Sequence, residues 1–336
     1  MKKILVTGGL GFIGSHTVVE LQNAGFDVVI IDDLSNSSIE VLDNIVEITG
    51  KKPDFHQLDL RIKSDVKEFF NTTKIDGIIH FAAFKAVGES VQKPLEYYEN
   101  NIGSLVYLLQ EMRDRNFDNF IFSSSCTVYG QADELPITEN APVKTAESPY
   151  GNTKQVGEEI IKEACNAHNF NAIALRYFNP VGAHDSIKIG ELPLGVPQNL
   201  IPFVTQTAAG IREELSIFGD DYPTEDGTAV RDYIHVVDLA KAHIAALQRL
   251  LDKKNKANFE FFNVGTGKGS SVLEVVKSFE KVADKKLNYK IVGRREGDIT
   301  AAYADTTLAS KELNWKTEKT LDEALESAWK WQQSQS

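Results

Sequence analysis

Short runs of apolar residues alternate with amphipathic stretches through the first half of the chain. The apolar runs predict strands at 2–7, 27–32, 55–58, 77–81, 120–124 and 173–177. Apolar residues at helical spacing predict helices at 12–23, 64–72, 95–115 and 150–168. Strands that alternate with helices in this way favour a parallel, doubly wound α/β sheet.

The composition of the chain changes after Tyr177. Residues 178–232 are rich in glycine, proline and asparagine, and long irregular connections of this kind usually carry ligand contacts. Helices are expected again near 236–251, 271–283 and 321–333. We therefore predict a first domain over 1–178, to which some later segments return, and a smaller α+β lobe over 179–336 that mainly binds the substrate.

A glycine-rich turn follows the first predicted strand and opens the first predicted helix. Gly8, Gly11 and Gly14 form the pattern G-x-x-G-x-x-G. Glycines at such a place allow a tight turn, the approach of backbone N–H groups to a pyrophosphate, and close packing of the helix on the strand. The pattern predicts a Rossmann-type dinucleotide site, although glycine clusters also form ordinary turns.

Two acidic residues identify the dinucleotide. Asp32 ends the second predicted strand, where a carboxylate binds the ribose 2′-hydroxyl. Asp32 and Asp33 would repel a 2′-phosphate, and no arginine precedes Arg61 to offset them. An aspartate that only caps a turn is the alternative at this position. The charges predict NAD as the cofactor rather than NADP.

Candidate catalytic residues lie at the end of one strand and the start of the next helix. Tyr150 and Lys154 are four residues apart, which places both on one face of the predicted helix. This spacing also arises by chance in a chain of this length. Ser123, Ser124 and Ser125 end a strand at the edge where open α/β sheets bind ligands, although serines also end strands for local hydrogen bonding.

With these motifs the chain resembles the extended short-chain dehydrogenase/reductase superfamily, and within it the UDP-glucose 4-epimerase family. The resemblance covers nearly the whole chain, through the segments 7–16, 81–90, 123–130, 175–184, 221–235 and 294–298. It implies an isomerase that inverts C4 of UDP-hexoses, interconverting UDP-galactose and UDP-glucose. In the reaction that it implies, NAD oxidises the sugar to a 4-keto form, which turns over and is reduced on its other face.

The resemblance also implies roles for the catalytic trio. Tyr150 takes the proton from the 4-hydroxyl group, Ser125 hydrogen-bonds the oxygen at C4, and Lys154 helps to keep the phenol acidic. A free tyrosine has a pKa of about 10, so a base at neutral pH needs a shift of roughly three units. One cation about 6 Å away supplies roughly 3 kcal/mol at an effective dielectric constant near 20. Lys154 and the oxidised nicotinamide ring together are sufficient by this reasoning.

Further site residues follow from the resemblance alone. The positions that match NAD contacts are Gly8, Gly11, Phe12, Ile13, Gly14, Asp32, Asp33, Asn36, Ser37, Asp59, Leu60, Phe81, Ala82, Ala83, Lys85, Asn100, Ser125, Tyr150, Lys154 and Phe178. The positions that match UDP-sugar contacts are Lys85, Ser125, Tyr150, Tyr177, Asn179, Asn199, Leu200, Phe218, Arg231, Tyr233, Arg295, Asp298 and Ala302. Taken singly, each arginine is more often part of a surface salt bridge.

One of these positions bears on the range of substrates. Ala302 is small where some members of the family carry a tyrosine beside the 2-substituent of the sugar. We therefore expect room for an N-acetyl group, and turnover of UDP-N-acetylglucosamine and UDP-N-acetylgalactosamine. The neighbouring Tyr303 is able to refill that space if its side chain turns inward.

Composition and charge exclude several other classes of protein. The net charge of −12 argues against a nucleic-acid partner, and no apolar run is long enough to span a membrane. Two cysteines cannot form a disulfide framework and no targeting segment is visible, so we expect a cytoplasmic protein. The seven histidines show no metal-ligand spacing, so we expect no metal site. By analogy with the family, the helices near 95–115 and 150–168 are expected to pair in a homodimer.

Two rival functions share the predicted fold. A sugar-nucleotide 4,6-dehydratase needs an acidic pair beside the serine, but Cys126 and Thr127 follow Ser125 here. A non-catalytic NAD-sensing module typically lacks the tyrosine or the lysine, and both are present. The segment 265–269 is similar to a phosphate-binding loop, but Gly269 stands where that loop needs serine or threonine, so we interpret it as a turn.

Overall fold

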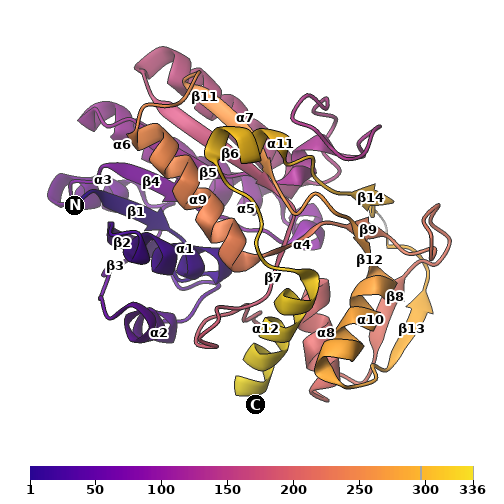
Figure 1. Ribbon diagram of the computed structural model, residues 1–336. Coiled ribbons are helices and arrows are strands. Elements are labelled where there is room, and N and C mark those ends of the chain that lie inside the picture. The colour runs from indigo at the N-terminus through magenta and orange to yellow at the C-terminus, as the bar shows by residue number, and fades with distance from the viewer. Residues whose placement is uncertain (296, 336) are drawn as a thin grey trace.

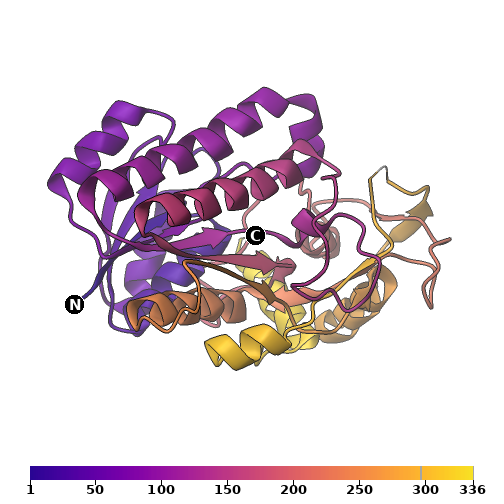
Figure 2. The ribbon, with the colours of Figure 1, turned by 90° about the horizontal axis from the view of Figure 1, so that it is seen from above.

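A seven-stranded parallel sheet with helices on both faces forms the larger part of the molecule (Figures 1 and 2). The computed structural model describes residues 1–295 and 297–335; Glu296, within the segment 294–298, lies outside the described residues. The order of the strands across the sheet is β11-β6-β5-β4-β1-β2-β3, and each neighbouring pair is parallel. The predicted doubly wound α/β fold is confirmed.

The elements have the following bounds. The strands are β1 Lys3–Thr7, β2 Asp27–Asp32, β3 Asp54–Gln57, β4 Gly77–His80, β5 Asn119–Ser123, β6 Asn171–Tyr177, β7 Asn179–Val181, β8 Leu215–Phe218, β9 Val230–Arg231, β10 Tyr233–His235, β11 Phe259–Val264, β12 Ser270–Ser271, β13 Tyr289–Val292 and β14 Ala301–Ala302. The helices are α1 Phe12–Asn23, α2 Glu40–Thr49, α3 Lys63–Thr72, α4 Val87–Gln92, α5 Pro94–Tyr98, α6 Ser104–Arg115, α7 Pro149–His168, α8 Leu200–Ala208, α9 Val236–Leu251, α10 Val272–Ala283, α11 Thr307–Leu313 and α12 Leu321–Ser334. A π-helical segment, η1 Glu99–Gly103, joins α5 to α6, and a 3₁₀ turn, η2 Cys126–Tyr129, follows β5.

The order of the strands reverses between β1 and β4. The chain runs from β1 outward through β2 to β3, then returns to pair β4 with the other side of β1. Crossover connections on opposite sides of this point leave a crevice at the carboxyl ends of the two strands, where open α/β sheets bind their ligands. A buried contact of 2.8 Å between Thr7 Oγ1 and His80 Nδ1, together with the bond from Phe81 N to Thr7 O at 3.1 Å, joins the two strand ends.

Each face of the sheet has its own hydrophobic core. On one face, residues of β1 and β2 pack against α1, α9 and α11. On the other face, the core includes residues of α3, α6 and α7 (Figure 2). The strand residues that face these cores, such as Ile4, Val29 and Ile78, are fully buried. Because both faces of the sheet are covered, the sequences of the strands are continuous apolar runs.

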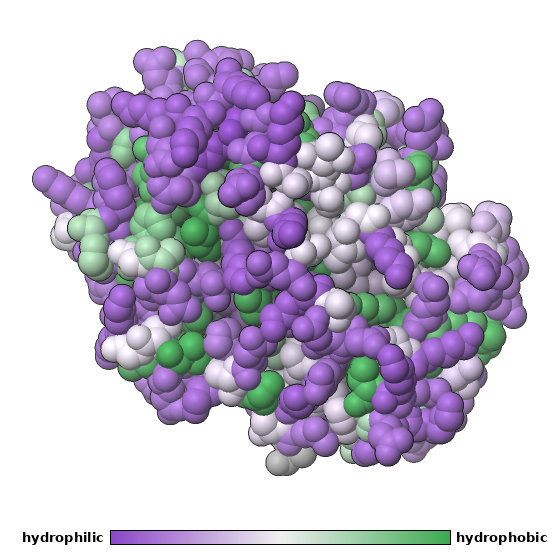
Figure 3. All heavy atoms as spheres, in the orientation of Figure 1, coloured by the Kyte–Doolittle hydropathy of each residue, from purple (hydrophilic) through white to green (hydrophobic). Residues whose placement is uncertain are grey.

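The second lobe is built from short strands and three longer helices (Figure 1). α8, α10 and α12 enclose a separate core with residues of β7, β8 and β10, and β13 pairs with β8 beside it. On the face shown in Figure 3, hydrophobic residues lie in small groups between hydrophilic ones. Among the described residues, no helix is both long enough and apolar enough to cross a membrane.

Several features of the large domain differ from the sequence prediction. The helices α2, α4 and α11 were not predicted. The helix expected at 95–115 is interrupted, because η1 separates α5 from α6. The edge strand β11 was not predicted; it comes from the second half of the chain and pairs with β6, beside the helix α9 that packs against α1. The division of the chain into 1–178 and 179–336 stays a prediction.

Candidate active site

The glycine-rich turn forms a narrow cradle between β1 and α1. Gly8 has φ +66°, a conformation that favours glycine. A Cβ atom on Gly14 would lie 2.1 Å from Gly8 O, and one on Gly8 would lie 2.9 Å from Ala82 N. α1 begins after Gly11, with no side-chain cap and no acidic residue in its first turn. The free N–H groups of the helix are therefore available to a pyrophosphate, and the cradle fits a dinucleotide.

Asp32 lies beside this cradle at the end of β2 and is buried. Its Oδ2 accepts a hydrogen bond from Leu10 N at 3.0 Å, and its Oδ1 accepts from Leu34 N at 3.0 Å and from Ser37 Oγ at 2.7 Å. These bonds fix the carboxylate next to the glycine turn. Each oxygen has two acceptor sites, so Oδ2 retains capacity for a ribose hydroxyl.

Other predicted NAD contacts lie in the segments that follow β2 and β3, and they differ in exposure and in hydrogen-bond partners. Asp33 accepts from Ser35, and the Asn36 side chain is exposed. Leu58 N donates to Asp32 O at 3.2 Å, which brings the segment that precedes Asp59 to the same edge. Asp59 forms a bidentate bond with Arg61, and this bond holds the pKa of Asp59 below its usual value. The Leu60 side chain is buried in the hydrophobic core, which leaves only its backbone for a ligand.

Only one of the three serines at the end of β5 remains available for catalysis. Ser123 Oγ lies 2.5 Å from the hydroxyl of Tyr177, and Ser124 Oγ donates to Glu158 Oε1 at 2.5 Å. Ser125 caps the turn η2, where its Oγ accepts a bond of 3.2 Å from Thr127 N, and its hydroxyl also bonds the Tyr150 side chain. The tertiary structure thus assigns structural contacts to Ser123 and Ser124 and places the hydroxyl of Ser125 beside that of Tyr150.

Tyr150 and Lys154 lie on one face of α7, as their spacing predicts. The helix starts at Pro149, and Ser148 caps it by accepting a bond from Gly151 N at 3.1 Å. Lys154 Nζ is 5.8 Å from the centre of the Tyr150 ring and donates to Ser123 O at 2.7 Å. The Ser123 carbonyl thus holds the ammonium group of Lys154 near the Tyr150 ring.

Burial dominates the electrostatics of this pair. It raises the pKa of the Tyr150 hydroxyl above its usual value; Tyr177 adds to the rise and the hydrogen bond with Ser125 opposes it. Burial lowers the pKa of Lys154 to about 8, against the carboxylate of Glu158, which raises it. In the protein alone, burial therefore keeps the Tyr150 hydroxyl protonated, and the phenol needs a positive charge in addition to that of Lys154 to act as a base near pH 7.

A second group of predicted residues meets across the crevice. Lys85, in the loop after β4, lies 3.6 Å from Glu191 Oε1, and Asn199 Nδ2 donates to the same oxygen at 2.7 Å. Asn199 precedes α8, whose first residue is Leu200. The loop after β4 and the start of α8 are therefore neighbours, although they are far apart in the sequence.

The predicted diphosphate and uridine contacts form a third group in the smaller lobe. Asp298 Oδ1 lies 2.8 Å from an Arg295 nitrogen and 3.7 Å from an Arg231 nitrogen. The Arg295 guanidinium lies 5.6 Å from the centre of the Phe218 ring, which is 42% exposed. Burial raises the pKa of the Cys126 thiol to about 12, and the positive charge of Arg231 opposes this rise. Arg231 therefore lies near Cys126, the residue that follows Ser125.

Short strands bring the remaining predicted residues together. Asn179 pairs with Tyr233 between β7 and β10, and Ala302 pairs with Arg231 between β14 and β9. Phe178 and Ala302 are buried in one small apolar cluster. The Phe81, Ala82 and Ala83 backbone follows β4 beside the glycine turn, and the Asn100 side chain donates to Asn101.

Two residues that the sequence prediction missed hold the loops of the site. Asn101 Oδ1 accepts from Phe84 N at 2.8 Å, while its Nδ2 donates to Phe84 O and to Thr153 Oγ1, each at 3.0 Å. Asp232 accepts from Thr266 N and Gly267 N, which shows that the segment 265–269 is a turn closed on a carboxylate. No sequence pattern identifies these partners, because each joins distant segments.

Among the described residues, no group of three or more histidine, cysteine, aspartate or glutamate side chains is arranged to hold a metal ion.

Comparisons with known proteins match nearly the whole chain. A model of the GDP-mannose 4,6 dehydratase family matches residues 5–328. The UDP-glucose 4-epimerase of Drosophila melanogaster is 50% identical over 98% of this chain and 96% of its own. Among solved structures, the UDP-glucose 4-epimerase of Stenotrophomonas maltophila with bound NAD and formylated UDP-arabinopyranose superposes with a TM-score of 0.96 (46% identity, 100% of this chain and 99% of that one). The enzyme of Bifidobacterium longum in complex with NAD+ and UDP gives a TM-score of 0.94 (48% identity, 99% and 98%).

Proposed function

Because the chain belongs to the UDP-glucose 4-epimerase family, we propose that it is an NAD-dependent isomerase that inverts the configuration at C4 of UDP-hexoses. The observation that carries the proposal is the placement of Ser125, Tyr150 and Lys154 at the carboxyl edge of the sheet, beside the glycine cradle. UDP-galactose and UDP-glucose are the proposed substrates. The inversion proceeds through a 4-keto sugar that turns over in the site.

The chain's own residues divide the work of this reaction. Bound NAD supplies a reversible hydride acceptor and a positive charge, and Gly8, Gly14 and Asp32 hold it. Tyr150 accepts the proton of the 4-hydroxyl group and returns it, while Ser125 donates a hydrogen bond to the oxygen at C4. Lys154, held on the carbonyl of Ser123, stabilises the ionised phenol.

The nucleotide is proposed to lie against the smaller lobe. Arg231 and Arg295 carry forked guanidinium groups that suit a diphosphate, and Phe218 offers an exposed ring to the uracil. Asp298 keeps both arginines oriented. An anchor at this end of the ligand leaves the sugar free to rotate near Tyr150.

A 4,6-dehydratase is the second candidate, because the matching family model carries that description. Eliminating water across C5 and C6 needs an acid and a base placed beside the serine. Cys126 and Thr127 occupy those positions, and burial raises the pKa of the Cys126 thiol to about 12, which makes it a poor acid or base at pH 7. The epimerase proposal is therefore preferred.

Product analysis tests the proposed reaction directly. The purified protein is expected to convert UDP-galactose to UDP-glucose without net formation of NADH, and the Tyr150→Phe variant is expected to retain bound cofactor but lose at least about a thousandfold in turnover. A 4-keto-6-deoxy product would establish the dehydratase instead. A fully active Tyr150→Phe variant would remove Tyr150 from the mechanism.

We further propose that UDP-N-acetylglucosamine and UDP-N-acetylgalactosamine are substrates. Ala302 offers a methyl group at the position in question, and the ring of Tyr303 lies close to Gly269, where a Cβ atom would be 2.9 Å from it. We propose that the Tyr303 ring keeps this place and does not refill the space. Ala302→Tyr is expected to abolish turnover of the N-acetyl sugars and retain turnover of UDP-galactose; equal loss of both would contradict the proposal.

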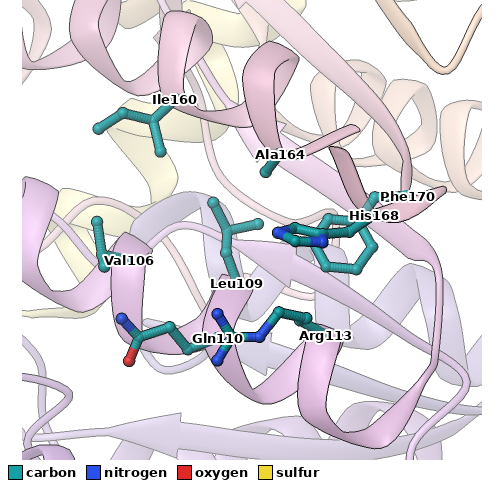
Figure 4. Close-up of a pocket in the computed structure, with 8 residues that line it drawn as sticks. All are labelled: Val106, Leu109, Gln110, Arg113, Ile160, Ala164, His168 and Phe170. Atoms are coloured by element: carbon teal, nitrogen blue, oxygen red, sulfur yellow. The ribbon is translucent and has the colours of Figure 1, made fainter. Parts of the chain in front are cut away.

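We also propose that the active species is a cytoplasmic homodimer built on α6 and α7. A pocket between the two helices is lined by Val106, Leu109, Gln110, Arg113, Ile160, Ala164, His168 and Phe170 (Figure 4). Its apolar side chains suit a helix pair from a second copy of the chain. Ile160→Glu is expected to give a monomer in sedimentation velocity, whereas the exposed Glu159→Gln is expected to leave the dimer intact.

A further inference from the structure

A buried polar network lies directly behind the catalytic side chains. Its centre is Glu158, one helical turn beyond Lys154 on α7. Glu158 Oε1 accepts from Ser124 Oγ at 2.5 Å and from Arg176 Nε at 2.9 Å, and its Oε2 pairs with an Arg176 nitrogen at 2.5 Å. The two charged side chains are 8% and 5% exposed. A buried ion pair adds little stability compared with apolar residues of the same size, so its place here points to another role.

The network joins the two segments that carry the catalytic residues. Ser124 immediately precedes Ser125 at the end of β5, and Glu158 lies on the helix that carries Tyr150 and Lys154. One carboxylate therefore connects the strand end to the helix. Loss of that connection would change the separation between Ser125 and the catalytic pair on α7.

Arg176, the second partner, is held firmly on β6. Its guanidinium lies 4.0 Å from the centre of the Phe261 ring, and its NH1 donates to the hydroxyl of Tyr129 at 3.0 Å. Tyr129 in turn donates to Asn263 Oδ1 at 2.7 Å. With these partners the guanidinium keeps a fixed position opposite Glu158.

The charge of Lys154 depends on this network. Its ammonium group has a neutral carbonyl as its hydrogen-bond partner, and Glu158 is the carboxylate whose field raises its pKa. Arg176 balances Glu158, so the buried pair as a whole is neutral.

The other titratable groups around Lys154 carry no charge near pH 7. Burial lowers the pKa of His80 on β4 to about 3 and raises that of Tyr177 on β6 to about 12. Tyr150 on α7 is protonated because burial raises its pKa. Burial lowers the pKa of Lys154, and among these neighbours the Glu158–Arg176 pair carries the charge that acts on it in the protein alone.

We propose that Glu158 and Arg176 are positioning residues for the epimerisation: the pair keeps the charge behind Lys154 balanced and holds Tyr150 and Lys154 in register with Ser125. This inference rests on the proposed function, because it assigns the pair its role through the catalytic residues.

Neutralising Glu158 and neutralising Arg176 are expected to move the pKa of Lys154 in opposite directions. Activity is lost as pH rises through the pKa of Lys154, since the neutral amine cannot stabilise the ionised phenol. Glu158→Gln leaves Arg176 as an uncompensated cation, and we expect the alkaline limb of kcat for UDP-galactose to move down by about one pH unit. Arg176→Gln leaves Glu158 as an uncompensated anion, and the limb is expected to move up by about one unit.

A double variant tests the balance of charge itself. Glu158→Gln/Arg176→Met removes both charges, and a neutral replacement of a buried pair is usually tolerated in folding. Its alkaline limb is expected within about 0.3 unit of the parent protein, although neither charge remains. A purely structural role predicts instead that the variants differ in stability and in kcat, and that none of them moves the alkaline limb.

A matched pair far from the site serves as the control. Arg249 Nε donates to Glu260 Oε2 at 2.7 Å, and this ion pair joins α9 to β11. Glu260→Gln is expected to lower the thermal midpoint and leave the position of the alkaline limb unchanged.

Two results would overturn the inference. One is an alkaline limb that moves in the same direction, or not at all, in both folded single variants. The other, decisive even if the single variants fail to fold, is a double variant whose limb is displaced by more than about half a unit. Failure of the proposed function is recognised separately, because the parent protein itself would then not convert UDP-galactose.

Discussion

Gly14 is the residue at which the cofactor cradle leaves least room for a side chain. A Cβ atom there would lie 2.1 Å from Gly8 O, and that backbone oxygen has no rotamer by which to move away. The fit follows from the close packing of α1 on the turn. The shape of the dinucleotide cradle therefore depends on the absence of a side chain at Gly14.

At this scale we predict that Gly14→Ala destabilises the fold by about 1–3 kcal/mol and weakens NAD binding at least tenfold. Gly88→Ala is the control, because a Cβ atom on Gly88 meets nothing within 4 Å and alanine favours its helix α4. Thermal unfolding and titration with NAD measure the two effects. An unchanged affinity in Gly14→Ala would mean that the turn relaxes, contrary to the crowding seen here.

Among the elements, the π-helical segment η1 shapes the site by interrupting a helix. A π-helical turn shifts the side chains that follow it, and such segments are frequent at functional sites. Here it places Asn101 where it bonds both backbone groups of Phe84 and the hydroxyl of Thr153 on α7. The loop after β4 and the catalytic helix are joined by that one side chain.

We predict that Asn101→Ala lowers stability by about 1–3 kcal/mol and raises the KM for UDP-galactose, because Phe84 N and Phe84 O lose their partner. Thr153→Val removes only the bond to α7, so it is expected to lower stability by about 1 kcal/mol and to change KM less. Urea unfolding and initial rates distinguish the two. Equal KM effects in both variants would assign the influence to α7 rather than to the loop.

Across the whole molecule, buried histidines couple stability to pH. Burial lowers the pKa of His16 and His80 to about 3 and that of His235 and His243 to about 4, below the value of 6.5 in the unfolded chain. The unfolded chain therefore binds protons between about pH 4 and pH 6.5 that the native protein does not. The stability is fully present above pH 6.5 and is lost as pH falls below it.

We predict that the free energy of unfolding at pH 5 is lower than at pH 7 by up to about 2 kcal/mol for each of these histidines. Urea unfolding at the two pH values measures the difference. His243→Gln is expected to reduce the difference. A stability that is constant from pH 5 to pH 7 would contradict the buried, neutral state of these side chains.

Local patterns were sufficient for the parts of this protein that depend on neighbours in the sequence. The apolar runs predicted β1, β2, β4, β5 and β6, because a strand buried on both faces has no polar positions. The glycine turn, Asp32, and the four-residue spacing of Tyr150 and Lys154 were equally visible, since each is set by one turn or one helix. The long matches to one family supplied the roles that no local pattern carries.

Only the tertiary structure decided which partner each of several identical residues has. Ser123, Ser124 and Ser125 are identical in the sequence, and only the packing of β5 against β6 and α7 gives the first two to Tyr177 and Glu158. The sequence likewise predicted that Lys154 and the oxidised nicotinamide ring together keep Tyr150 acidic, and that stays a prediction. Only the fold shows how strongly burial opposes it, by raising the pKa of Tyr150 and lowering that of Lys154 in the protein alone. Burial and partners across distant strands are properties of the closed fold. For that reason neither can be read from the order of residues alone.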